Sequence, residues 1–315
     1  MGSIKKLQRL ADELEKNKSD NGAPSDDLIS QIGEDEGFVG KLRHMAHKNP
    51  LAAISALLII IFVLAAICAP VLTPYSYEAQ DVLNRVAHPS KEHLLGTDEL
   101  GRDVFTRLLY GARVSLAIGV VPTIVSMILG AVLGMISGFL GGLIDTLIMR
   151  FADIMLAFPS LLLAMVIMYT LGDGITSIFV ALAIVNWASV ARVVRAETLS
   201  LKEAEYVEAA RSIGVSKLTI IFRHILPNCI PSLIVLFTLN IPSAILAESS
   251  LSFLGIGVQP PASSWGVMAN AGSQFLYTAP MLSLAPSIAI MLVVLAFNFL
   301  GDGLRDTLDP HLKNM

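Results

Sequence analysis

Residues 206–228, YVEAARSIGVSKLTIIFRHILPN, form a charged segment between two long apolar stretches, and their residue types suit protein contact. Ser200 followed by Glu203 is a capping-box pattern, and apolar residues then recur at every third position, which predicts a helix. Gly214 should end this helix because glycine adopts the left-handed conformation easily, and Ser216 suits the N-cap of a second helix. We therefore expect a helix, a glycine bend and another helix.

The first predicted helix of this segment carries small side chains beside charged ones. Ala209 and Ala210 would let another protein surface approach the helix backbone closely. Glu208 and Arg211 would supply charge at the rim of that contact. The pattern therefore predicts a surface on which a partner protein docks.

The composition of the chain indicates a membrane protein. Of its 315 residues, 54% are hydrophobic and 15% are charged, whereas soluble domains have about 25% charged residues. The apolar residues gather in six blocks near or above the ~20 residues that cross a bilayer. These predicted spans are 51–69, 114–140, 154–171, 175–191, 229–247 and 281–300. We expect an all-α polytopic membrane protein with six transmembrane helices, and the first span lies too far from the start to be a cleaved signal peptide.

The distribution of Lys and Arg predicts the orientation. Six spans put both termini on one side, and with the termini inside, the inner segments hold 17 of the 22 Lys and Arg residues. The positive-inside rule then places both termini and the 206–228 segment in the cytoplasm. Three outer cations, Arg102, Arg107 and Arg113, lie in an amphipathic stretch that could follow the membrane surface.

We expect three regions along the chain. Residues 1–40 contain the turn-rich polar run NKSDNGAPSDD, which predicts a flexible cytoplasmic tail. Residues 41–100 hold the first transmembrane helix and an external loop. Residues 101–312 hold a core domain with five transmembrane helices and a cytoplasmic helix-Gly-helix loop at 197–228.

The same loop resembles a known family motif. The matching residues are Glu208, Ala209, Ala210, Gly214, Leu226 and Pro227. Together they resemble the EAA loop of ABC-importer permeases, and His224 two residues before Leu-Pro resembles the dipeptide, oligopeptide and nickel branch of these permeases. Other stretches similar to that branch are 94–116, 141–164, 247–266 and 300–310. The resemblance covers residues 40–312 and is closest to a C-type permease subunit with an ABC type I importer fold.

The resemblance implies a transmembrane permease subunit of an ATP-driven ABC importer in a bacterial or archaeal cytoplasmic membrane. A homologous second permease would complete the translocation pathway, and an external binding protein would deliver oligopeptides or dipeptides. Two ATP-binding cassette subunits would use ATP and Mg²⁺ and would push on the loop at 197–228, the coupling loop, to drive alternating access. Nickel or another small solute is the alternative cargo within the same branch.

Polar residues inside the spans are costly and therefore favour interior positions. Asn240 and Glu248 could line a polar path through the membrane. Alternatively, neighbouring serines and a partner subunit could hold Glu248 as a structural group. Arg150 and Asp153, three residues apart, suit an ion pair on one helix face near the cytoplasmic boundary.

Glycines and prolines inside the spans predict packing features. A smooth helix face is formed by glycines four residues apart, Gly130, Gly134 and Gly138. Such a face suits close helix packing within the chain or between subunits. Prolines inside the apolar runs, at Pro122, Pro159 and Pro242, should kink or interrupt their helices.

Other function classes fit less well. The sequence has no GxxxxGK[ST] phosphate loop, so we expect no ATPase site and no bound cofactor in this chain. An ion-coupled carrier would use Glu248, Asp153 and Asn240, but we expect such a carrier to have broken helices in repeated halves, which the sequence does not indicate. An intramembrane hydrolase would need a catalytic motif such as HExxH or GxSxG, and the sequence contains neither. No Cys or His pair has a usual metal-ligand spacing, and the net charge of −4 gives no sign of nucleic-acid binding.

Overall fold

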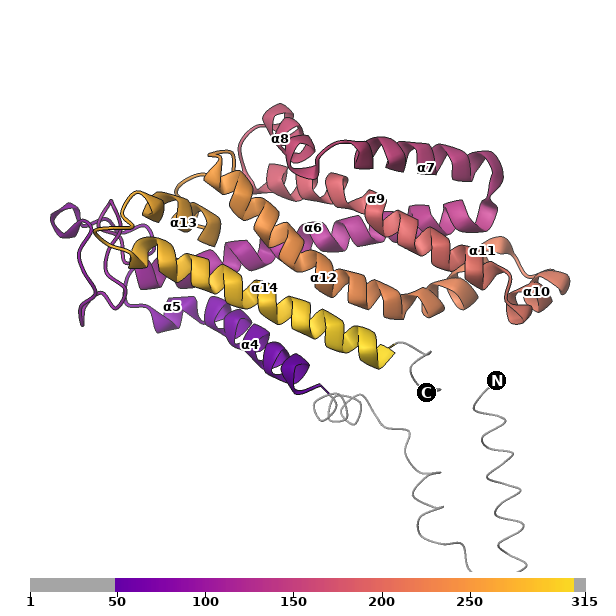
Figure 1. Ribbon diagram of the computed structural model, residues 1–315, viewed down its shortest axis with the longest axis horizontal. Coiled ribbons are helices and arrows are strands. Elements are labelled where there is room, and N and C mark those ends of the chain that lie inside the picture. The colour runs from indigo at the N-terminus through magenta and orange to yellow at the C-terminus, as the bar shows by residue number, and fades with distance from the viewer. Residues whose placement is uncertain (1–48, 309–315) are drawn as a thin grey trace, which may run out of the picture. The chain divides into compact units, whose positions relative to one another are not determined.

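The computed structural model describes residues 49–308, which are helical apart from connecting segments and an isolated bridge between Thr97 and Asp103 (Figure 1). The predicted tail at 1–40 lies outside the described residues. The helices are α4 Pro50–Ile67, α5 Ala69–Leu72, η1 Val82–Asn84, α6 Val104–Leu140, α7 Gly142–Ala157, α8 Ser160–Leu171, α9 Ile175–Lys202, α10 Glu205–Ser212, α11 Lys217–Ile220, the π-helical turn η2 Ile221–Ile225, α12 Leu226–Phe253, α13 Trp265–Ser273 and α14 Met281–Leu308.

The long apolar helices confirm the predicted all-α membrane fold. Within the described range, α4, α6, α9, the run from α11 through α12, and α14 are each long and apolar enough to cross a bilayer. A further candidate is the pair of α7 and α8, bent by 95°. The span predicted at 154–171 covers only the second part of this crossing, which begins at Gly142 and is interrupted at Pro159 as the sequence predicts. Phe158 and Pro159 adopt extended backbone conformations between the two helices, and Pro159 cannot donate a helical hydrogen bond.

The glycine face of α6 packs directly against α9. Gly130 lies against Val190, and Gly138 lies against Thr198. A Cβ added to Gly134 would come within 2.6 Å of a backbone carbonyl oxygen of α9. This confirms the predicted close helix contact and assigns it to the interior of the chain. Because the contacts advance in the same order along both helices, α6 and α9 run parallel.

This parallel arrangement determines the role of the bent helix pair. Residues 141–174 must carry the chain from the C-terminal end of α6 back to the N-terminal end of α9, and α7 and α8 make this return (Figure 1). The pair therefore acts as one broken crossing, which gives six crossings in the described range. The sequence predicts an interruption at Pro159, and the structure confirms it.

The outer end of α6 is built into a folded external region. The helix has 37 residues, or about 55 Å, which exceeds the ~30 Å hydrocarbon core. Asp103 caps it by accepting a hydrogen bond of 2.7 Å from the Thr106 amide. Arg107 is buried and donates to Ser263 Oγ at 3.2 Å, while Arg113 donates to two backbone carbonyls at the end of α4. Arg102 and Arg107 are buried, so these two do not face a surface as expected, whereas Arg113 is exposed and its position at the membrane surface stays a prediction.

The other long helices pack antiparallel to their neighbours. Gly119 of α6 lies against Ile245 of α12, whereas the opposite end of α6 shares a hydrophobic cluster with the start of α12. Gly303 of α14 lies against Ala52 of α4, and Asn49 donates to Asp306 at 3.3 Å. Alternating helix directions therefore agree with the predicted up-and-down order of the spans.

Gly134→Ala should destabilise the protein by about 1–3 kcal/mol, because the added methyl group would clash with the α9 backbone. Gly111→Ala on the same helix is the matched control, since its Cβ would meet the nearest atom at 3.4 Å, an ordinary contact. Thermal unfolding of the detergent-solubilised protein measures both variants. Equal unfolding midpoints for the two would contradict the close α6–α9 contact.

Candidate functional site

The C-terminal end of α9 leads directly into the predicted coupling loop. α9 continues through Lys202, and α10 begins only at Glu205, after an extended residue, Ala204, that makes no side-chain cap. The predicted helix start at Ser200 and Glu203 is therefore wrong. Ser200 lies inside α9 because that helix extends further than its apolar sequence indicated.

The glycine bend is present as predicted. Gly214 has φ of +80°, and the amides around it close the end of α10. The Gly214 amide donates to the Arg211 carbonyl, and the Val215 amide donates to the Ala210 carbonyl, both at 3.1 Å. This is a Schellman arrangement, which satisfies carbonyls that a helix end leaves free.

The second half of the loop leads into the membrane without a break. Ser216 caps α11 by accepting from the Thr219 amide at 3.2 Å, as predicted. η2 and α12 follow as one helical run, and Pro227, which cannot donate a helical hydrogen bond, directly follows the wider π-helical turn η2. His224 lies in η2 with its ring 6.2 Å from that of Tyr206, and burial raises the pKa of the Tyr206 phenol.

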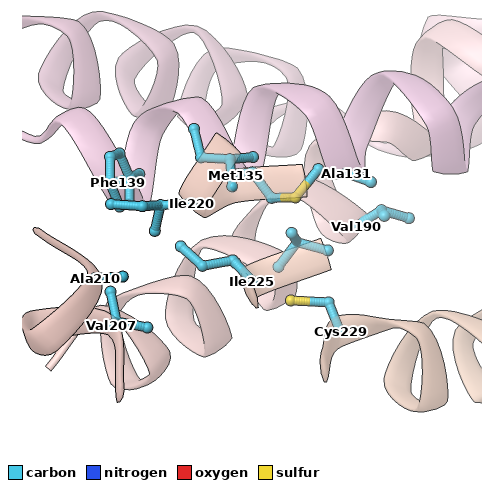
Figure 2. Close-up of a cluster of buried hydrophobic side chains, with 11 residues drawn as sticks. Ala131, Met135, Phe139, Val190, Val207, Ala210, Ile220, Ile225 and Cys229 are labelled. Atoms are coloured by element: carbon cyan, nitrogen blue, oxygen red, sulfur yellow. The ribbon is translucent and has the colours of Figure 1, made fainter. Parts of the chain in front are cut away.

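One face of the loop is anchored in a hydrophobic cluster that joins it to three long helices (Figure 2). Val207 and Ala210 point from α10 into this cluster. Its buried members are Ala131, Met135, Phe139, Val190, Val194, Val207, Ala210, Ile220, Ile221, Ile225 and Cys229. Arg211 lies over the Phe139 ring at 5.8 Å, which adds a cation–π contact. The loop is thus fixed to the inner ends of α6, α9 and α12.

The opposite face of the loop is exposed and carries large apolar side chains among charged and polar ones. Ala209 and Glu208 point outward, whereas Ala210, which the sequence grouped with them, is buried against the chain's own core. The same loop carries four larger exposed hydrophobic side chains: Tyr206, Ile213, Leu218 and Phe222. The sequence analysis did not name these four residues. Their signal was an apolar side chain recurring among the charged residues of a loop.

The two residues predicted to line a path lie on α12. Asn240 is half-buried, and its side-chain amide donates to the Leu236 carbonyl at 2.8 Å. Glu248 has no exposed surface in this chain, and its Oε1 accepts hydrogen bonds of 2.6 Å from both Ser252 and Ser264. Because Ser264 is the N-cap of α13, Glu248 connects the short helix α13 to α12. A path-lining role for either residue stays a prediction.

An open hollow of about 410 Å³ lies beside this connection, between α12 and α13. It is lined by Leu246, Ser249, Ser250, Phe253, Leu254, Gly266 and Ala269. Within the described residues, no group of three or more His, Cys, Asp or Glu is placed to hold a metal ion. The hollow therefore offers hydroxyl groups and apolar surface to whatever covers it.

Comparison with known proteins identifies the family. Residues 130–314 match the binding-protein-dependent transport system inner membrane component, and residues 44–89 match the N-terminal transmembrane domain of oligopeptide transport permease C. The dipeptide transport system permease protein DppC of Alkalihalophilus pseudofirmus is 48% identical over 267 residues, covering 85% of this chain and 88% of that protein.

Two glutathione transport system permease proteins are similarly close. GsiD of Shigella flexneri serotype 5b is 48% identical over 269 residues, and GsiD of Escherichia coli O157:H7 is 45% identical over 269 residues. Each alignment covers 84% of this chain and 88% of the relative. The chain belongs to the family of binding-protein-dependent transport system inner membrane components. It is a multi-pass inner-membrane permease subunit of an ABC importer and not the ATPase of that system, which confirms the predicted class.

Glu248→Leu should lower stability by about 1–3 kcal/mol, because it leaves two buried serine hydroxyls without their acceptor. Glu248→Gln retains an acceptor oxygen and should cost less. Thermal unfolding and co-purification of the second permease measure the effect, with Ser250→Ala as the control, since Ser250 is exposed and donates to its own helix. Reduced transport by a fully stable Glu248→Gln variant would favour the path-lining role instead.

Proposed function

We propose that this permease imports short peptides, from dipeptides to oligopeptides, and that its coupling loop at 197–228 is the docking site of an ATP-binding cassette subunit. The exposed apolar face of the loop carries this proposal. Large apolar side chains on a cytoplasmic loop are costly to leave in water, and their exposure supports a protein contact there. Ile213 is 81% exposed.

The helix at the centre of the proposed contact is suited to close docking. Ala209 presents only a methyl group, so a partner surface could approach the α10 backbone, and Glu208 and Arg211 would provide charge beside it. Gly214 fixes the angle between α10 and α11 through its left-handed backbone. His224, Leu226 and Pro227 would act indirectly, by carrying the chain from the loop into α12.

The anchored face of the loop supports a mechanism for coupling. A push on the outer face would act through Val207 and Ala210 on the cluster that joins α6, α9 and α12. Close-packed side chains resist compression and transmit displacement. ATP-driven movement of the docked subunit would therefore shift these three helices together and alternate access to the path.

The remaining assignments complete the proposed complex. A homologous second permease, two ATP-binding cassette subunits that use ATP and Mg²⁺, and an extracytoplasmic peptide-binding protein would assemble with this chain in a bacterial or archaeal cytoplasmic membrane. Both termini would lie in the cytoplasm, with residues 1–40 as a tail, 41–100 as the first helix and external loop, and 101–312 as the core permease domain. The positive charge of the inner segments supports this orientation.

The peptide assignment rests on the relatives. A dipeptide permease at 48% identity and glutathione permeases at 45–48% identity, across more than four fifths of the chain, support a short peptide as cargo. Uptake of labelled peptides by cells lacking this gene tests it. Intact peptide uptake together with lost nickel uptake would assign the chain to a metal cargo.

Gly214→Pro should leave the protein inserted but separate ATP hydrolysis from transport. Proline cannot adopt φ of +80° and lacks the N–H that bonds to Arg211. Gly214→Asn is the matched control, because Asn tolerates the left-handed region. Peptide uptake and ATP hydrolysis are measured together in proteoliposomes containing the full transporter. We expect Pro to lower uptake per ATP at least about tenfold, equivalent to ~1.4 kcal/mol, and Asn to keep most of it.

Ala209→Arg should weaken association with the ATPase subunit, because a long charged side chain would occupy the space above the α10 backbone. Co-purification of that subunit with the permease measures the effect. Wild-type co-purification and wild-type transport with both Ala209→Arg and Gly214→Pro would rule out docking at this loop.

The proposed orientation predicts which positions face the outside of the cell. In a Cys68→Ser background, a membrane-impermeant thiol reagent applied to intact cells should label Ser90→Cys and Tyr277→Cys, both exposed positions, but not Glu205→Cys. Labelling of all three after the membrane is permeabilised confirms that each thiol is reactive. External labelling at position 205 would place the coupling loop on the wrong side for a cytoplasmic ATPase.

A further inference from the structure

Two layers of ion pairs join α7 to α9. In the first layer, Asp145 accepts hydrogen bonds of 2.5 and 2.7 Å from Arg195. In the second layer, Asp153 accepts a hydrogen bond of 2.5 Å from Arg192 and lies 3.7 Å from Arg150. The sequence predicted the pair of Arg150 and Asp153, and the structure adds Arg192 as the nearer partner.

The second layer lies deeper along the crossing than the first. Asp145 is three residues into α7, whereas Asp153 is eleven residues into it, so the two layers are separated by about 12 Å along the helix. Arg192 is likewise one turn further from the cytoplasmic end of α9 than Arg195. The second layer therefore lies about two helical turns further along the crossing, towards the break at Phe158 and Pro159.

The deeper layer is nevertheless the more exposed one. The side chains of Arg150, Arg192 and Asp153 are 77%, 50% and 43% exposed. In the shallower layer, the side chains of Arg195 and Asp145 are 32% and 17% exposed. Charged side chains at membrane depth face the interior of a bundle or a water-filled cavity, because contact with lipid is costly. The exposed face of this layer is therefore a candidate cavity wall that a second subunit completes.

The backbone beside this layer supports the same conclusion. The break at Phe158 and Pro159, five residues after Asp153, interrupts the helical hydrogen bonding of the crossing. Non-helical backbone at membrane depth is tolerated where it is buried in protein or lines a water-filled cavity. Broken helices also occur beside the substrate sites of transporters.

We propose that Arg150 and Arg192 line the translocation cavity and bind the carboxylate of the passing peptide. This inference rests on the proposed function as a peptide permease. The cluster holds two guanidinium groups and one carboxylate, so a peptide carboxylate would balance the remaining positive charge. Arg presents a planar set of donors that matches a carboxylate, and Asp153 holds Arg192 in place for that contact.

The first test measures transport with the complete importer, its binding protein included, in proteoliposomes. Replacing both arginines, Arg150→Gln with Arg192→Gln, should lower uptake of a peptide with a free C-terminal carboxylate about tenfold, because charge-assisted hydrogen bonds are lost. The Arg150→Lys, Arg192→Lys pair keeps both charges and should restore most of the uptake. Arg150→Gln alone preserves the Arg192–Asp153 pair and serves if the double variant fails to assemble.

The second test measures whether water reaches the site. In the same complex, Arg150→Cys should react with a water-soluble thiol reagent, and peptide should slow that reaction. Ile60→Cys is the control, since Ile60 lies in the middle of α4, is 53% exposed and belongs to a helix without charged residues. Equal reactivity at positions 150 and 60 would overturn the proposal, as would wild-type uptake by the double Gln variant.

A third comparison separates the peptide from a lipid headgroup. If omitting anionic lipid reproduces the transport loss in the wild type, the arginines bind lipid and the proposal is wrong. If the wild-type complex lacks ATP-dependent peptide uptake altogether, the proposed function fails. If the wild-type complex transports peptide and the arginine variants transport it equally well, only the proposed carboxylate site is refuted.

Discussion

The parallel contact between α6 and α9 is the constraint on which the rest of the structure depends. Three glycines, Gly130, Gly134 and Gly138, bring the two helices so close that a methyl group on any of them would clash. Parallel neighbours leave the connecting chain to cross back, and in lipid every backbone group on that route must find a partner within the protein. The broken pair of α7 and α8 is the result. The same contact also brings the inner ends of α6 and α9 together.

Those inner ends form the base of the coupling loop. Phe139 from α6 and Val194 from α9 share a cluster with Val207 and Ala210, so the loop cannot move without the helices beneath it. The outer face is left with Ile213 and other apolar side chains exposed. A loop that is rigidly held on one side and apolar on the other suits the transfer of force from a docked subunit. At the far end of α12, Glu248 connects the same helix to α13.

Much of this architecture could be predicted from the sequence, because membrane spans are determined by the length of apolar blocks and Gly214 has a local conformational reason to end a helix. What failed depended on distant residues. Whether Ala209 or Ala210 faces outward is decided by Phe139 and its neighbours, which are far away in sequence. The capping-box pattern at Ser200 does not start a helix, because α9 continues through that residue to Lys202.

The outer arginines show the same limit. The amphipathic stretch around them suggested a segment along the membrane surface, but Arg107 donates to Ser263, which is distant in sequence, and Arg113 donates to the end of α4. Similarly, spacing alone predicted the pair of Arg150 and Asp153, whereas Arg192 reaches Asp153 only because α7 packs on α9. Local patterns identify which side chains need partners, and the tertiary packing decides which partners they obtain.

The central claim is that the outer face of the coupling loop contacts the ATPase subunit. The most direct measurement places a photo-crosslinking amino acid at Ile213 in the assembled transporter and identifies the crosslinked product by mass spectrometry. We predict a crosslink to the ATP-binding cassette subunit that strengthens or weakens when ATP is bound, and none to that subunit from Ile60 on α4. Absence of any ATPase crosslink from position 213, in a complex that still transports peptide, would contradict this account.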